Sequence, residues 1–144
     1  MTSRTRRRVA IVGGGPGGLF LAALLRTRRP DLEVTVLERN GRHDAFGFGV
    51  VFSDATLKAI DAADPVLRDG LRDHGEHWDR IEVRQATPEH PGGTVSHGFS
   101  GNGMAAIHRR TLLRLLQENA ERAGAELRFS TPAPDVDVLA ATYD

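Results

Sequence analysis

The sequence contains no cysteine, and this absence removes several kinds of chemistry at once. Disulfide bonds, cysteine nucleophiles and cysteine metal ligands are excluded, which fits a protein of the reducing cytoplasm. The 19 basic and 19 acidic residues balance, so no overall field attracts the molecule to nucleic acid or to an anionic membrane. Aromatic residues make up only 6% of the chain, too few for a platform on which bases stack.

Long apolar runs are also missing. The arginines at positions 4 and 6–8 precede the run VAIV, but GGGPGG interrupts that run before it reaches the length of a signal peptide or a membrane span. We therefore expect a cytoplasmic protein with no membrane partner and no nucleic-acid partner, and the sequence leaves its oligomeric state undefined. A chain of 144 residues, 40% of them apolar, is long enough for one domain with its own core.

The most informative stretch is RRVAIVGGGPGGLFLAALL, residues 7–25. Its β-branched run over residues 9–12 is typical of a buried strand, and residues 19–26 predict a helix. A second strand is predicted over residues 34–38. Strand, helix and strand in this order form a βαβ unit, which makes the two strands parallel and the crossover right-handed. The sequence therefore predicts an α/β fold, a Rossmann-like domain with a parallel, doubly wound sheet.

The rest of the chain predicts shorter elements and a small β excursion. Turn-forming residues are frequent in the middle of the chain, and the clearest apolar periodicity lies near its end. In order, we expect a glycine-laced loop over residues 41–53, a helix capped by Ser53 and stopped by Pro65, strands over 80–85 and 94–97, a helix over 111–123 ended by Gly124, a strand over 126–130, and no element in the last fifteen residues.

The glycines after the first strand match the pattern G-x-G-x-x-G at Gly13, Gly15 and Gly18. In this pattern the first glycine permits a tight turn, the second lets the backbone approach a pyrophosphate, and the third lets the helix lie close to the strand. The helix N-terminus then directs N–H groups and the positive end of its dipole at the phosphates. The loop, with Pro16 and Gly17, therefore predicts a site for a dinucleotide.

An acidic residue completes the pattern. Glu38 ends the second strand, 20 positions beyond Gly18 (38 minus 18), where the dinucleotide fingerprint places a carboxylate that accepts hydrogen bonds from the ribose hydroxyls. The same carboxylate would repel a 2′-phosphate, which disfavours NADP at this position. The pattern alone does not separate FAD from NAD. An NAD-dependent dehydrogenase and a non-catalytic nucleotide-binding module therefore stay open as alternatives.

Two further stretches carry a resemblance. GRHDAFGFGVVFSDATLKAI and AAIHRRTLLRLLQENAERAGAELRF, with GGGPGGLFLAALL and LEVTVLERN, resemble in order and spacing the N-terminal half of the class A flavoprotein monooxygenases, the para-hydroxybenzoate hydroxylase fold family. Within this family, GFGVVFSDATL and SHGFSGNGM are most similar to enzymes that hydroxylate aromatic acyl-CoA thioesters, such as the salicylyl-CoA 5-hydroxylases and 2-aminobenzoyl-CoA monooxygenases. The resemblance covers nearly the whole chain.

The resemblance implies FAD as cofactor, NAD(P)H as reductant, O2 as co-substrate and a small aromatic substrate, with an aromatic acyl-CoA as one candidate. It also implies positions for several residues. Arg39 would lie by the adenine or the diphosphate, and Phe48, Gly49 and Val50 would pass beside the flavin. Arg109 would reach the diphosphate or the ribityl chain, a role that the adjacent Arg110 could also take. No residue is implied as catalytic.

The chain also departs from the family. The family continues with a Gly-Asp motif whose aspartate binds the ribityl chain and then with a substrate domain, and this sequence has no Gly-Asp pair. We therefore expect residues 1–144 to be a FAD-binding domain that is incomplete at its C-terminus, the amino-terminal fragment of a longer flavoprotein.

His74 and His77 lack a third ligand at matching spacing, so no metal site is predicted. His97 and His108 are candidates to face the flavin or the substrate.

Overall fold

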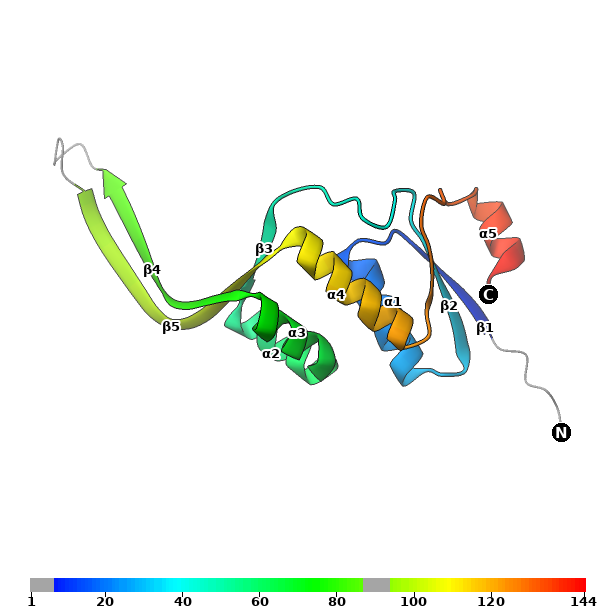
Figure 1. Ribbon diagram of the computed structural model, residues 1–144, viewed down its shortest axis with the longest axis horizontal. Coiled ribbons are helices and arrows are strands. Elements are labelled where there is room, and N and C mark those ends of the chain that lie inside the picture. The colour runs from blue at the N-terminus through cyan, green and yellow to red at the C-terminus, as the bar shows by residue number, and fades with distance from the viewer. Residues whose placement is uncertain (1–6, 87–93) are drawn as a thin grey trace.

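The computed structural model describes residues 7–86 and 94–144 and shows an α/β body from which a long two-stranded arm projects (Figure 1). The body holds the helices and the parallel sheet, and the arm is antiparallel. In chain order the elements are β1 (Arg7–Val12), α1 (Pro16–Arg28), β2 (Leu32–Leu37), β3 (Gly49–Ser53), α2 (Asp54–Ala63), α3 (Pro65–His74), β4 (Glu76–Ala86), β5 (Thr94–His108), α4 (Arg109–Arg122), β6 (Glu126–Arg128) and α5 (Val136–Thr142).

The parallel sheet has the strand order β1-β2-β6, so β2 lies in its centre. Val9 is opposite Val34 in the first pair, and Thr35 is opposite Glu126 in the second. Helices α1 and α4 pack on each other and on this sheet, where Ala22 and Ala120 are fully buried in one apolar cluster with strand residues such as Val36. Small side chains at these two positions let both helices lie close to the strands. The predicted α/β class with a parallel sheet is confirmed.

The second sheet is antiparallel, with the strand order β3-β5-β4. The base of β5 joins the body, because Ile107 is buried against Leu71 of α3 and Leu112 of α4. The predicted β excursion is confirmed, but its strands are longer than expected. The prediction stopped at residue 97 because the glycines that follow were interpreted as turns. The structure keeps these glycines inside β5, with Gly101 at a φ of 88°.

The helix after Ser53 is confirmed, since the hydroxyl of Ser53 accepts a hydrogen bond from the Thr56 N–H and caps α2. Pro65 does more than end that helix. It occupies the first turn of α3, where a missing N–H costs nothing, and Asp64 caps the new helix by accepting from the Leu67 N–H at 3.0 Å. The sequence analysis missed α3.

The predicted helix before Gly124 is confirmed as α4, and Gly124 has the φ of 91° expected beyond a C-terminus.

Two loop predictions were wrong. Residues 49–53, expected as part of a loop, form β3 and pair with residues 104–108 of β5. The last residues, expected to hold no element, form the short helix α5 and then return to β1, where the Asp144 N–H donates to the Arg8 carbonyl at 2.8 Å. For β3, a distant strand supplies partners that the local sequence does not show. Across residues 7–86 and 94–144, no helix combines the length and the apolar character needed to cross a bilayer.

Candidate dinucleotide-binding site

The glycine loop connects β1 to α1 with a tight turn. Gly13 has a φ of 105°, which side-chain-bearing residues rarely adopt, and its N–H donates to the Leu37 carbonyl at 2.8 Å. A Cβ atom on Gly18 would overlap the carbonyl oxygen of Gly13. Only glycine at position 18 therefore allows α1 to start this close to the strand.

The N-terminus of α1 faces open space. Its N-cap residue, Gly15, has no side chain that could cap the helix. Pro16 follows at the start of the helix, and the first turn holds no acidic residue. A Cβ atom on Gly15 or Gly17 would meet nothing within 4 Å. The free N–H groups of this first turn therefore have no side-chain cap and lie beside open space, and the helix dipole favours negative charge there.

Glu38 lies directly after β2, beside the glycine loop. Its carboxylate accepts hydrogen bonds from the Gly14 N–H at 2.7 Å, the Asn40 N–H at 2.8 Å and the Asn40 side-chain amide at 2.8 Å. Burial opposes the charge, but these bonds to Asn40 and Gly14 and the nearby Arg39 outweigh it, so the pKa of Glu38 is lowered. A Cβ atom on Gly14 would come within 2.9 Å of the Glu38 Cβ, which explains why position 14 is also glycine.

The hydrogen bonds on Glu38 limit what it can still bind. An ionised carboxylate offers about four acceptor positions, two on each oxygen. Both positions on Oε1 are used by Asn40, and one position on Oε2 is used by Gly14. Oε2 can therefore accept one further hydrogen bond without rearrangement. A second ribose hydroxyl would have to displace the Asn40 side-chain amide.

Arg109 reaches the same place from the first turn of α4. It lines a cavity of about 120 Å³ together with Gly14, Gly15 and Glu38. Its Nε atom is buried and has no hydrogen-bond partner within the described part of the chain. A buried guanidinium nitrogen without a partner is costly unless a ligand supplies one, and a phosphate oxygen is a suitable acceptor. Arg110 is exposed and does not line this cavity, so the geometry favours Arg109 over Arg110 for the predicted role.

Other predicted contacts do not line this cavity. Arg39 is exposed and does not line it, and neither do Phe48, which is 93% exposed, and Gly49. Val50 is half-buried in β3 and packs against a second apolar cluster, the one that contains Leu71, Ile107 and Leu112. Phe48 is nevertheless tied to α4, because its carbonyl accepts from the Arg109 N–H at 3.0 Å.

The sequence analysis missed several residues of the cavity wall. Phe129 follows β6, and since β6 is parallel to β2, its carboxyl end meets that of β2 beside Glu38. Topology could have placed Phe129 there once the strand order was known. The Arg42 guanidinium lies 4.7 Å from the centroid of the Phe129 ring. Asn40, Arg42 and the buried Gln117 carry no sequence pattern that marks them.

The fold and this site together define an α/β dinucleotide-binding protein: a glycine loop, an open helix N-terminus and a strand-end carboxylate surround one cavity. Comparison with known sequences is more specific. Residues 6–138 match the family described as FAD binding domain, and the chain belongs to this family. The cofactor is therefore FAD, which decides between the two dinucleotides that the fingerprint left open.

Individual relatives agree with this family. The chain is 57% identical to salicyloyl-CoA 5-hydroxylase of a Streptomyces species, covering 89% of this chain and 23% of that protein. It is 35% identical to 3-hydroxy-4-methyl-anthranilyl-[aryl-carrier protein] 5-monooxygenase of Streptosporangium sibiricum, covering 89% and 34%. A solved variant of 2-methyl-3-hydroxypyridine-5-carboxylic acid oxygenase shares the fold, with a TM-score of 0.70, 20% identity and coverage of 88% and 32%. The chain thus spans only 23% to 34% of each relative's length.

Proposed function

We propose that this chain is the FAD-binding part of a flavoprotein monooxygenase that hydroxylates an aromatic acyl-CoA with NAD(P)H and O2. The observation that carries the proposal is the buried Nε of Arg109, which has no hydrogen-bond partner among the described residues and whose side chain lines one cavity with Gly14, Gly15 and Glu38. The substrate class is supported by the 57% identity to salicyloyl-CoA 5-hydroxylase.

Each group at the cavity has a defined part in binding FAD. The N–H groups of the glycine loop and of the first turn of α1 hold the diphosphate, and Arg109 supplies the positive charge that the helix dipole only partly provides. Glu38 accepts one ribose hydroxyl on Oε2. FAD, when bound, supplies the redox chemistry. Phe48, whose carbonyl accepts from the Arg109 N–H, and Gly49 would pass beside the flavin end, while Val50 supports them from the core.

The reaction is tested on the full-length, FAD-loaded protein with salicyloyl-CoA. We expect thioester-dependent oxidation of NAD(P)H and a product heavier by one oxygen atom, which mass spectrometry with 18O2 assigns to molecular oxygen. The other atom of O2 leaves as water with the two electrons from NAD(P)H. Retained FAD without any oxygenated product would contradict the monooxygenase and favour a non-catalytic flavin-binding role.

The cofactor site is tested by replacing Arg109. Arg109→Gln should raise the Kd for FAD about tenfold or more, because a charge-assisted hydrogen bond to phosphate contributes about 1.5–3 kcal/mol. Arg122→Gln is the matched control, since Arg122 lies on the same helix and does not line this cavity. Equal FAD affinity in the two variants would show that Arg109 does not contribute to FAD binding.

A further inference from the structure

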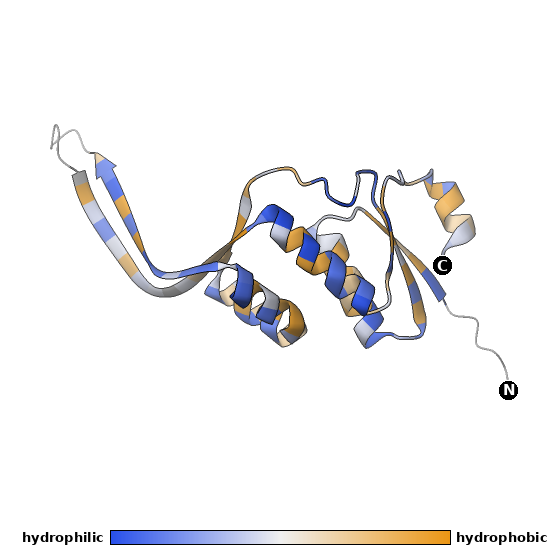
Figure 2. Ribbon diagram, in the orientation of Figure 1, coloured by the Kyte–Doolittle hydropathy of each residue, from blue (hydrophilic) through white to orange (hydrophobic). Residues whose placement is uncertain are grey.

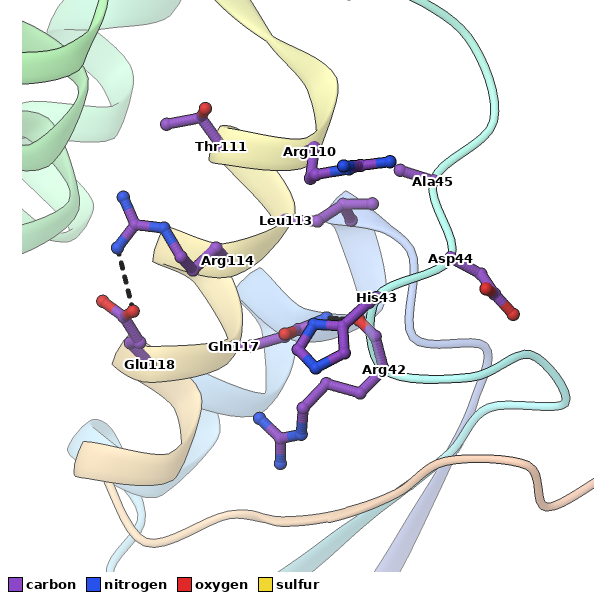
Figure 3. Close-up of a pocket in the computed structure, with 10 residues that line it drawn as sticks. All are labelled: Arg42, His43, Asp44, Ala45, Arg110, Thr111, Leu113, Arg114, Gln117 and Glu118. Atoms are coloured by element: carbon purple, nitrogen blue, oxygen red, sulfur yellow. Dashed lines mark hydrogen bonds and ion pairs between the residues drawn. The ribbon is translucent and has the colours of Figure 1, made fainter.

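A second, larger cavity adjoins the first and lies between the segment formed by residues 42–45 and α4 (Figure 3). Its volume is about 360 Å³, within the range of small-molecule sites. The two cavities share Arg42, Asp44, Leu113 and Gln117, so they are adjacent and have part of their wall in common. Gln117 fixes that wall, because it is only 7% exposed and its amide donates to the Arg42 carbonyl at 3.0 Å.

The lining of this cavity, which we call the arginine cavity, is rich in positive charge. Arg110 and Arg114 reach it from α4, and Arg42 from the facing segment. In Figure 3, Arg110 extends from the helix toward Ala45 at one end, and Arg42 lies at the other end. The His43 ring lies between them. Arginine guanidinium groups bind phosphate through paired hydrogen bonds, and a cluster of them is typical of phosphate recognition.

The acidic residues of the lining are already engaged. The Asp44 carboxylate accepts from the Gly41 N–H at 2.7 Å, and Glu118 pairs with Arg114 at 2.9 Å. Arg42 is paired with Glu121. The guanidinium of Arg110 has no ion pair with any residue that the structure describes. Among residues 7–86 and 94–144, the arginine cavity therefore offers one cation without an ion pair, Arg110, and two more that can turn toward a stronger anion.

We propose that the arginine cavity binds the phosphates of a second adenine nucleotide beside FAD. Two sources share this chemistry, the adenosine 3′-phosphate 5′-diphosphate end of a CoA thioester and the phosphates of NADPH. The proposal rests on the proposed function for the identity of these two ligands. It places the second ligand next to the FAD site, since the two cavities have one wall in common.

The experiment uses full-length protein that is already loaded with FAD, so that a probe cannot simply fill the cofactor site. Adenosine 3′,5′-bisphosphate and NADPH are titrated separately by calorimetry under anaerobic conditions, into wild type, Arg110→Gln and Arg122→Gln. We expect saturable binding of at least one probe. Arg110→Gln should weaken it about tenfold, because the Arg110 guanidinium lines the cavity and has no ion pair within the described ranges. Arg122→Gln should leave it unchanged, because Arg122 does not line the cavity.

Each outcome assigns or overturns the site. Arg110-dependent binding of the bisphosphate assigns the site to CoA, and thus to a substrate carried on free CoA, because an acyl group on a carrier protein lacks this nucleotide. Arg110-dependent binding of NADPH alone assigns the site to the reductant. If neither probe binds, or if Arg110→Gln binds like wild type, the proposal is overturned. Flavin absorbance is read first: failure to retain FAD contradicts the proposed function, whereas retained FAD without Arg110-dependent binding contradicts only the second site.

Discussion

The central strand of the parallel sheet and the outer strand of the arm lie in opposite surroundings. In β2 every residue except Glu33 is buried. In β4 only Trp78 is even half-buried, and all other positions are exposed. Both strands pair along their length with a neighbour. Backbone pairing is therefore common to the two regions, and the difference between them is whether other elements cover the faces of the sheet.

The arm nevertheless has two chemically distinct faces. Ile81 lies opposite Phe99 and Val83 opposite His97, and these pairs share one face, whereas Arg80, Glu82 and Arg84 point to the other. Figure 2 shows this alternation along β4. No residue in the described ranges covers the apolar face, where Phe99 is 57% exposed. Since an isolated hairpin is marginally stable at best, the arm depends on its base, where β5 meets β3 and the second apolar cluster.

The largest loss of stability is expected from a substitution that fills the space between α1 and the end of β1. Gly18→Ala places a Cβ atom on the Gly13 carbonyl oxygen and should destabilise the protein by about 3 kcal/mol. Gly17→Ala is the control, because a Cβ there meets nothing within 4 Å, and alanine stabilises a helix by roughly 0.5–1 kcal/mol relative to glycine. Urea unfolding measures both. Equal stabilities would show that the close approach at Gly18 is not needed.

A matched pair of valines compares the two regions directly. Val36 in β2 is 1% exposed and Val83 in β4 is 48% exposed. Val36→Ala should cost about 2 kcal/mol, because two buried carbon atoms are lost and a cavity remains. Val83→Ala should cost less than about 0.5 kcal/mol. A large loss at Val83 in urea unfolding would mean that something covers the apolar face of the arm.

A smaller effect is expected from Glu38 as the pH changes. Its pKa is lower in the folded protein than the ordinary value of 4.5, so the ionised carboxylate stabilises the fold above that value. This contribution is lost as the pH falls through the folded pKa. Wild type should therefore unfold at a higher temperature than Glu38→Gln near neutral pH, and the difference should shrink below pH 4.5. A difference in Tm that stays constant across this range would contradict the role of the charge.

The sequence correctly predicted the elements that short-range patterns specify. The βαβ unit, the turn at Gly13 and the position of Glu38 at a strand end all follow from short-range spacing. What it missed depends on distant partners: β3 is a strand because β5 pairs with it, and Phe129 lines the cavity because β6 lies beside β2. Arg109 and Arg110 are equivalent in sequence. Only the structure shows that the first lines the dinucleotide cavity and the second the arginine cavity.

The central claim is that the glycine loop and Glu38 bind FAD. It is tested most directly by titrating the protein with FAD, following flavin fluorescence, with NADH as competitor. The account predicts saturable binding that NADH does not displace. Glu38→Gln should weaken it about tenfold, through the loss of a charge-assisted hydrogen bond, and Glu33→Gln, an exposed position on β2, should not. Displacement of FAD by NADH, or equal affinity in Glu38→Gln and wild type, would contradict the account.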